Sequence, residues 1–269
     1  MPTDEPELDA VAAQKLPFEE EHLRANERMA GLEPSDRGVL DLAQPMTGGP
    51  LGDCVLDAGC GIGNFVEILR HRVDRVLAVD LSPKNIAVLG ARFGDASNVE
   101  VLQADLDVQR EELRAEGVDA IVCLDVLEHI EDDAALVRSF AGILPEGGTL
   151  FVKVPAHQWL FGSVDEASDH QRRYSRKGLV RLVQEAGFDV RAARYMNFAG
   201  VGPYFLKSRV LRKGAAFSNT FDERQLRWIR RSIGAFRAVD RALGLVGPGG
   251  GPVVGQSAVL VARRLGDGV

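Results

Sequence analysis

Cysteine is scarce in this chain of 269 residues, and the three present, Cys54, Cys60 and Cys123, lack the CxxC spacing of a structural metal site. Each lies in an apolar or glycine-rich stretch, which predicts reduced structural thiols rather than a disulfide framework. The acidic start MPTDEPELDA is not followed by an apolar segment, so the sequence shows no secretory signal. From these observations we expect a cytoplasmic protein.

A long apolar run is also missing. The longest stretch without a charged residue, 242–262, contains Pro248, Pro252 and a run of three glycines at 249–251. A lipid-exposed helix would not carry these residues, because each frees backbone groups that the bilayer core cannot satisfy. We therefore expect a loop followed by a strand at 257–262, and no transmembrane segment.

Positive charge is low overall and unevenly distributed. The net charge of −7 and the 6% aromatic content argue against a nucleic-acid partner, since phosphate affinity comes from clustered Lys and Arg. Residues 1–169 hold 13 Lys and Arg against 33 Asp and Glu, whereas residues 170–269 hold 19 against 6. The basic C-terminal third favours an anionic acceptor or an anionic membrane surface, but solvated helix faces would explain it equally well.

After an unpatterned acidic tail at 1–16 and two short helices within 18–43, short apolar runs alternate with amphipathic segments. Such alternation is typical of βα units on a parallel sheet, and it predicts a single domain over 17–269. Strands are expected at 53–57, 75–80, 99–103, 119–124, 148–154, 188–194 and 257–262. Helices are expected at 63–72, 83–93, 110–116, 132–143 and 176–186.

The segment 200–246 breaks this alternation. One helix is expected from Pro203 towards Leu211, and a second places apolar side chains on one face, namely Leu226, Ile229, Ile233 and Phe236. We expect a helical insertion before the last strand. Three roles for the insertion are considered: a lid or pocket wall, contact with a membrane, and packing on the core or on a partner subunit. Packing is favoured, because membrane-surface helices usually have a larger exposed apolar face.

The segment CVLDAGCGIGNF at 54–65 runs from a short apolar strand into Gly59, Gly61 and Gly63. Glycines there let the backbone turn tightly and approach a ligand where a Cβ would clash. Asp80 ends the next strand 23 residues after Asp57, close to the spacing at which a carboxylate reaches the two hydroxyls of a ribose. The pattern predicts a nucleoside-containing ligand at the carboxyl ends of the strands.

The kind of nucleoside is narrowed by two details. The glycine spacing is GxGxG rather than the GxGxxG of dinucleotide sites. Asp57 at the strand end would repel a diphosphate and would suit a cationic amino group. Both details disfavour an NAD-dependent oxidoreductase, which stays the alternative from another class of enzyme.

Five motifs stand in the order and at the spacing of one known family, and AGFDV (186–190) follows them. They are VLDAGCGIGNF (55–65), VLAVDLSP (76–83), VLQADL (101–106), DAIVCLDVLEHI (119–130) and LPEGGTLFVKVP (144–155). Over roughly residues 50–195 the sequence resembles the class I S-adenosylmethionine-dependent methyltransferases. The resemblance implies S-adenosyl-L-methionine as cofactor and a three-layer, doubly wound, Rossmann-like α/β fold. Its sheet would have seven strands with the last one reversed, which residues 257–262 can supply.

Carried over position by position, the family pattern places the cofactor at the ends of the first four strands. The methionine and sulfonium portion would lie at Asp57, Gly59, Cys60, Gly61 and Gly63. The ribose would be held by Asp80, and the adenine would lie at Leu81, Asp105 and Leu106. The wall between cofactor and acceptor would contain Asp125, Val126 and His129. The competing interpretation of Asp57 and Asp80 is a helix cap or turn former.

The loop after the fifth expected strand, 155–175, is the densest in reactive side chains. Substrate-pocket candidates there are His157, Trp159, Arg172, Arg173 and Tyr174. Methyl transfer is an in-line displacement, and it needs a base only where the acceptor must lose a proton. His170 is the preferred base, because imidazole accepts a proton near neutral pH, and Asp165 would orient it.

Two alternatives for this loop stay open. Its side chains would equally form a structural hydrogen-bonded knot, with Ser175 capping the next helix. A metal at His157, Asp165 and His170 is disfavoured, because these residues show no strict ligand spacing, and no metal is expected.

We therefore expect a methyltransferase that modifies a small-molecule acceptor at oxygen or nitrogen, with carbon left open. The segment DHQRRYS followed by AGF resembles small-molecule methyltransferases of natural-product and glycan or cell-envelope biosynthesis. A protein or nucleic-acid methyltransferase is the alternative within the family, but LDVLEH stands where a base methyltransferase would have (D/N)PPY. A non-catalytic S-adenosylmethionine-binding protein is a further alternative. The sequence leaves the oligomeric state open, a homo-oligomer included.

Overall fold

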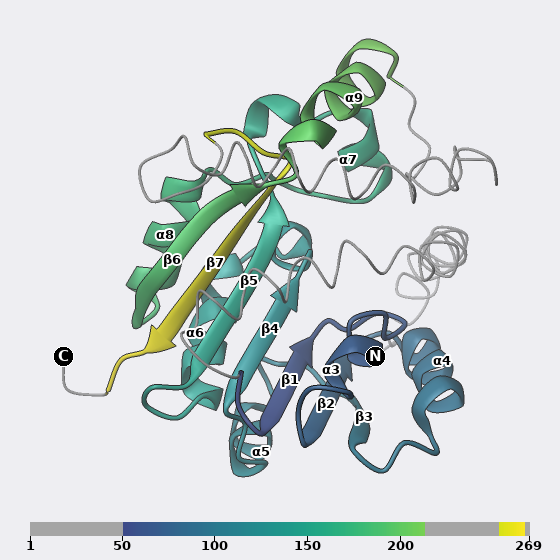
Figure 1. Ribbon diagram of the computed structural model, residues 1–269, viewed down its shortest axis with the longest axis vertical. Coiled ribbons are helices and arrows are strands. Elements are labelled where there is room, and N and C mark those ends of the chain that lie inside the picture. Colours follow the sequence, from purple (N-terminus) through teal and green to yellow (C-terminus); the bar gives the residue numbers. More distant parts are fainter. Residues whose placement is uncertain (1–50, 213–252, 267–269) are drawn as a thin grey trace, which may run out of the picture.

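The computed structural model describes residues 51–212 and 253–266, which form a sheet with helices on both faces (Figure 1). The expected acidic tail at 1–16, the helices within 18–43, the second helix of the 200–246 insertion and the glycine run at 249–251 lie outside the described residues.

Seven strands form the sheet in the order β3-β2-β1-β4-β5-β7-β6. Their bounds are β1 Cys54–Ala58, β2 Arg75–Asp80, β3 Val99–Gln103, β4 Ala120–Leu124, β5 Thr149–Pro155, β6 Phe188–Met196 and β7 Ser257–Arg264. The first five strands pair in parallel, and β7 runs antiparallel to both β5 and β6. The Rossmann-like sheet with a reversed last strand is confirmed, and every expected strand is present within two residues of its predicted bounds.

The helices cover the sheet in two layers. The longer ones are α4 (Pro83–Phe93), α6 (Asp133–Ile143) and α8 (Arg176–Glu185), and the shorter ones are α3 (Val66–Leu69) and α5 (Arg110–Ala115). Side chains of α3 and α4 pack into one apolar core, and side chains of α5, α6 and α8 pack into another. With the sheet between the two cores, the molecule has the three layers of a doubly wound fold.

Local chemistry explains where these helices begin. Ser82 and Ser175 cap α4 and α8 by accepting the amide hydrogens of Asn85 and Gly178. The capping role expected for Ser175 is therefore confirmed. The helix expected at 63–72 is shortened to α3. Gly63, with φ +81, lies outside the right-handed helical region, so the helix begins after it.

Several short helices were not expected. The 3₁₀ turn η2 (Leu127–His129) carries His129, and η3 (Gln158–Leu160) and α7 (Ser163–Ala167) lie within the loop after β5. The helix expected from Pro203 begins two residues earlier, as η4 (Phe198–Gly200) leads into α9 (Val201–Phe205) and a π-helical turn, η5 (Leu206–Val210). Within 51–212 and 253–266, no helix combines the length and apolar character that crossing a membrane requires.

All three cysteines are buried and unpaired. Burial raises the pKa of the Cys60 and Cys123 thiols, which opposes formation of a reactive thiolate. The expectation of reduced structural thiols is confirmed.

Candidate functional site

The glycine loop follows β1 and crosses the carboxyl edge of the sheet. Gly59, Gly61 and Gly63 have φ of +71, +56 and +81, which only glycine adopts without strain. A Cβ on Gly59 would lie 2.6 Å from a methyl group of Val126, and one on Gly63 would lie 2.5 Å from the Phe93 ring. A Cβ on Gly61 would meet no atom within 4 Å. Packing therefore requires the first and third glycines, while Gly61 presents its backbone to open space that a ligand can approach.

Asp80, at the end of β2, fixes this loop. Its Oδ2 accepts the Gly61 amide hydrogen at 2.8 Å, and its Oδ1 accepts hydrogen bonds from the Ser82 amide at 2.8 Å and the Asn85 side chain at 3.0 Å. Asp57 lies in β1 beneath the loop and is only 2% exposed. The turn-forming role of Asp80 is thus present in the structure, and its contact with a ribose stays a prediction.

The ends of β2 and β3 form the side of the site expected to meet the adenine. Leu81 follows β2 with its side chain exposed, and its carbonyl oxygen accepts a hydrogen bond from Gln103 at 3.3 Å. Asp105 Oδ1 accepts the Asp107 amide hydrogen at 2.9 Å, while Leu106 is buried. The exposed Leu81 side chain offers an apolar surface on which a flat ring can pack.

The wall expected after β4 begins with a strained residue. Asp125 has φ +54, donates its amide hydrogen to the Lys153 carbonyl oxygen at 2.9 Å, and pairs through its carboxylate with the Lys153 ammonium group. Val126 closes the other side by packing against Gly59. Sequence reasoning missed Lys153, although a lysine within the apolar run FVKVP of β5 is a detectable signal.

A second group of polar side chains, which we call the His170 cluster, lies between η2, the loop after β5 and α9. Its members are Glu128, His129, Asp165, His170, Arg173 and Tyr204. The cluster brings together the predicted base, its predicted orienting carboxylate, and the predicted pocket residues His129 and Arg173. Sequence reasoning missed Glu128 and Tyr204, although a glutamate inside the apolar stretch DVLEHI is unusual enough to have been noted.

Asp165 is the centre of this cluster. It is completely buried, and its Oδ1 accepts hydrogen bonds from His170 Nδ1 at 2.9 Å and Arg173 Nε at 2.7 Å. Its Oδ2 accepts the Gly162 amide hydrogen and the Tyr204 hydroxyl hydrogen, both at 2.9 Å. Burial opposes ionisation, but the His170 hydrogen bond and the Arg173 charge outweigh it and lower the pKa of Asp165. An ionised Asp165 therefore holds the His170 ring in one orientation.

Glu128 faces the other nitrogen of that ring. Its side chain is completely buried, and its Oε1 lies 3.9 Å from His170 Nε2. Within the described residues no hydrogen bond reaches either carboxylate oxygen. Burial, with a smaller contribution from Asp125, raises the pKa of Glu128 well above its ordinary value. His129 packs edge-on against His170 with ring centres 4.8 Å apart.

The histidines that lie close together are not those of the metal site considered from the sequence. His157 has φ +63, and its ring packs against Tyr195 and Trp159 at 4.4 and 5.5 Å between centres. In the described part of the chain, the three side chains whose potential ligand atoms lie within 4.8 Å of one another are Glu128, His129 and His170.

Two of the predicted pocket residues attach the loop to α6. Arg172 pairs with Asp133 at 3.1 Å, and the Tyr174 hydroxyl group forms hydrogen bonds with Asp133 at 2.7 Å and the Leu127 carbonyl oxygen at 3.0 Å. These contacts are those of the structural knot. Contact of Arg172, Tyr174 or the half-exposed Trp159 with an acceptor stays a prediction.

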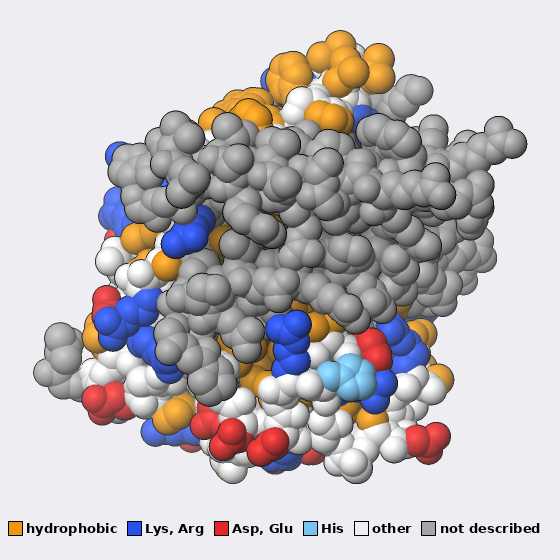
Figure 2. All heavy atoms as spheres, viewed as in Figure 1, with side chains coloured by type: hydrophobic (Ala, Val, Ile, Leu, Met, Phe, Trp, Pro, Cys, Tyr) orange, Lys and Arg blue, Asp and Glu red, His pale blue; other side chains and the backbone are white. Residues whose placement is uncertain are grey.

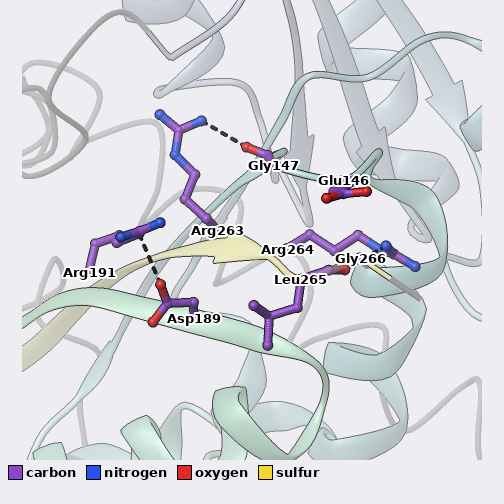
Figure 3. A pocket seen from close by; sticks show the side chains of 8 residues that line it. All are labelled: Glu146, Gly147, Asp189, Arg191, Arg263, Arg264, Leu265 and Gly266. Atoms are coloured by element: carbon purple, nitrogen blue, oxygen red, sulfur yellow. Dashed lines mark hydrogen bonds and ion pairs between the residues drawn. The ribbon is translucent and has the colours of Figure 1, made fainter. Parts of the chain in front are cut away.

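A surface pocket lies at the opposite end of the sheet (Figure 3). Arg263 of β7 lines it and donates to the Gly147 carbonyl oxygen at 2.9 Å, while Arg191 pairs with Asp189 at 3.3 Å. Because Arg263 is paired in register with Thr149, the first residue of β5, this pocket is at the amino end of that strand. Ligands of open α/β sheets bind at the carboxyl ends, so we do not assign the site to it.

Comparison with known proteins identifies a family to which the chain is similar. The family described as "Methyltransferase domain" matches residues 23–193. The ubiquinone biosynthesis O-methyltransferase of Xanthomonas campestris pv. campestris (strain B100) is 38% identical over 105 residues, which are 38% of this chain and 42% of that protein. The corresponding protein of Acinetobacter baylyi is 32% identical over 106 residues, which are 39% and 44% of the two chains. The chain thus spans less than half the length of these curated relatives.

Solved structures share the fold. A geranyl diphosphate methyltransferase in complex with S-adenosylmethionine has a TM-score of 0.55 at 14% identity over 87% of this chain and 85% of that one. The [4+2]-cyclase SpnF has a TM-score of 0.53 at 16% identity over 86% and 81%. At such identities the likeness concerns the fold alone, and the second name shows that this fold also carries other chemistry.

Proposed function

This chain belongs to the class I S-adenosylmethionine-dependent methyltransferases, and on that premise we propose that it methylates an oxygen atom of a small-molecule acceptor. The observation that carries the proposal is the His170–Asp165 pair, with its 2.9 Å hydrogen bond, in the loop that follows β5. A hydroxyl acceptor must lose a proton on methylation, and an oriented imidazole is suited to take it. The curated relatives named above are O-methyltransferases, which supports oxygen over nitrogen or carbon.

The glycine loop and its neighbours fit the cofactor. The backbone at Gly61 borders open space, Leu81 offers an exposed apolar surface, and Asp57 supplies a carboxylate beneath the loop. Asp80 would hold the ribose, and Asp105 and Leu106 would lie at the adenine. When bound, S-adenosylmethionine supplies an electrophilic methyl group on a sulfonium centre.

The cluster's own residues would handle the acceptor's proton. Because Asp165 accepts a hydrogen bond from Nδ1, the neutral His170 ring keeps its hydrogen there and presents the Nε2 lone pair. Arg173 and Tyr204 hold Asp165 in place, so the ring is fixed before the acceptor arrives. His170 Nε2 would then be placed to accept the proton that the hydroxyl group loses on methylation.

Calorimetry with S-adenosylhomocysteine, and in parallel with NADH, tests the cofactor. We expect S-adenosylhomocysteine to bind and NADH not to bind. The Asp80→Ala variant should weaken binding by about 100-fold, because two charge-assisted hydrogen bonds are lost. Binding of NADH alone would overturn the proposal in favour of an oxidoreductase.

The His170→Gln variant tests the base. With labelled S-adenosylmethionine and a panel of phenols and sugar alcohols, we expect turnover to fall about 10²- to 10⁴-fold while S-adenosylhomocysteine affinity stays unchanged. Chelator treatment should leave the wild-type rate unchanged. A rate that chelation abolishes and a divalent cation restores would contradict the base and assign Glu128, His129 and His170 to a metal. Cofactor binding without turnover on any acceptor would favour the non-catalytic alternative.

We also propose the remaining organisation. The placement of β7 between β5 and β6 supports one domain over 17–269, with 200–246 as an insertion.

The three free, buried cysteines support a cytoplasmic location, which cell fractionation tests. An anionic acceptor rests on the basic C-terminal third, and unchanged turnover in Arg176→Gln would count against it. A homo-oligomer is tested by sedimentation of the full chain.

A further inference from the structure

Large apolar side chains are exposed together on the outer side of α9 and η5. This surface, which we call the α9 patch, consists of Trp159, Phe198, Phe205, Leu206, Val210 and Leu211, each between 40% and 59% exposed. The Trp159 and Phe205 rings lie 6.1 Å apart, so η3 and α9 contribute to the same surface. Figure 2 shows hydrophobic side chains gathered at the top of the molecule, where Figure 1 places α9. A contiguous patch of this kind marks an interaction surface more often than single exposed residues do.

The exposure does not come from loose packing of the helix. Tyr204 and Ser208, on the inner side, are buried, and Tyr204 donates to Asp165 at 2.9 Å. Ser208 accepts the Val164 amide hydrogen at 3.3 Å, and its carbonyl oxygen accepts the Ser163 hydroxyl hydrogen at 3.0 Å. The inner side thus fixes the helix on the molecule and leaves the apolar side chains pointing outward.

The chain segment that carries most of the α9 patch is basic. Residues 195–212 contain no Asp or Glu, and their three basic residues are Lys207, Arg209 and Arg212. Two copies of this chain meeting through the patch would bring like charges together, which disfavours self-association. Apolar and aromatic side chains flanked by Lys and Arg are typical of segments that lie in the interface of an anionic bilayer.

We propose that the α9 patch docks on the surface of a bilayer containing anionic phospholipid. The apolar side chains enter the headgroup region, and the basic side chains contact the lipid phosphates while their aliphatic stems stay against the apolar surface. Tyr204 links the same helix to Asp165, so docking brings the His170 cluster to within one helix of the lipid surface. The docking itself does not depend on methyl transfer.

Vesicle sedimentation of the full chain tests this proposal. The probes are vesicles of phosphatidylcholine alone and of phosphatidylcholine with phosphatidylglycerol, without cofactor or acceptor. We expect binding to the anionic vesicles, weakened by raised salt, and little binding to the neutral ones. The Val210→Glu variant should reduce the partition coefficient about tenfold, because an apolar contact is lost and a repelled charge is added.

Val108→Glu is the matched control, because Val108 is also an exposed valine and lies after β3, away from the patch. It should bind as the wild type does, and circular dichroism should show both variants folded. Absence of wild-type binding to anionic vesicles, or equal loss in the two variants, would overturn the proposal. So would a wild-type dimer that Val210→Glu dissociates, since the patch would then be an interface between copies. Because no methyl donor is present, these results are independent of the proposed reaction.

Discussion

The carboxyl edge of the sheet and the His170 cluster are built in different ways. At the edge, the predicted cofactor residues all lie within a few residues of a strand end, between Asp57 and Val126. In the cluster, the members come from η2, α7, the loop after it and α9. Apart from the His170 amide, which donates to the Asp165 carbonyl oxygen at 3.0 Å, they meet through side-chain contacts. Local backbone geometry therefore governs the first region, and long-range polar contacts govern the second.

The largest test of this difference is Asp165→Asn. The change keeps the shape but leaves the buried Arg173 guanidinium without its counter-charge, so we expect the free energy of unfolding to fall by about 3–5 kcal/mol in urea at neutral pH. The pKa of Asp165 is lowered in the folded chain, so its contribution is present above its unfolded value and is lost as pH falls through the folded value. The difference between variant and wild type should narrow below about pH 4.

Asp169→Asn is the control for that experiment. Asp169 is an exposed neighbour in the same loop with φ +55, a conformation that asparagine tolerates. It should change stability by less than about 0.5 kcal/mol. Equal losses in the two variants would mean that the buried ion pair does not hold the cluster together.

Effects of intermediate size are expected in the glycine loop, where two substitutions can be compared with each other. Gly63→Ala would force its Cβ against Phe93 and Leu89 and should cost about 1–3 kcal/mol of unfolding free energy. Gly61→Ala meets no atom, so it should cost about 1 kcal/mol through its positive φ and should weaken S-adenosylhomocysteine binding more than Gly63→Ala does. Urea titration measures the two losses of stability, and calorimetry measures the two losses of S-adenosylhomocysteine affinity. If Gly63→Ala weakened binding more than Gly61→Ala does, Gly61 would not border the ligand.

The effect expected for Glu128→Gln is smallest at pH 4.5, and it grows as the pH rises. The folded pKa of Glu128 is raised, so its contribution to stability is complete below its unfolded value of about 4.5 and is lost as pH rises towards the folded value. Glutamine has no such loss, so the variant should gain on the wild type by at most about 1.4 kcal/mol per pH unit above that point. Thermal unfolding at pH 4.5 and 7 measures it, with exposed Glu131→Gln as the control. A wild type more stable than the variant at pH 7 would mean that Glu128 is ionised and paired with His170.

Sequence patterns were sufficient for most of the fold. β2, β3 and α4 fall at their predicted residues, because local patterns determine their limits. These are the buried apolar run of β2, the apolar residues of the edge strand β3, and a Ser-Pro helix start. α7 and the 3₁₀ turns escaped prediction, since they are shorter than a periodic pattern needs.

In the site, too, the residues that local patterns determine could be predicted, and those brought in by long-range contacts could not. Gly61 and Asp80 could be placed from the strand–loop–helix pattern alone. Tyr204 could not, because its contact with Asp165 joins residues 39 apart, on either side of α8 and β6. The His170–Asp165 pair was predictable, since both residues lie in one short loop. The neighbours that fix its orientation were not.

The chain between β6 and β7 is attached to the sheet at one place. Met196 is paired in register with Ser257, and Asn197 Nδ2 donates to Gln256 at 2.6 Å, so the segment 198–255 leaves and rejoins the sheet at a single point. Closing such a segment costs little more as it lengthens, about 0.6 kcal/mol for each doubling. Evolution can therefore replace, shorten or extend this segment as a unit while the strands below stay unchanged. Because Tyr204 lies in it, every such exchange would also change the donors that hold Asp165, and so acceptor chemistry can diversify on an unaltered cofactor edge.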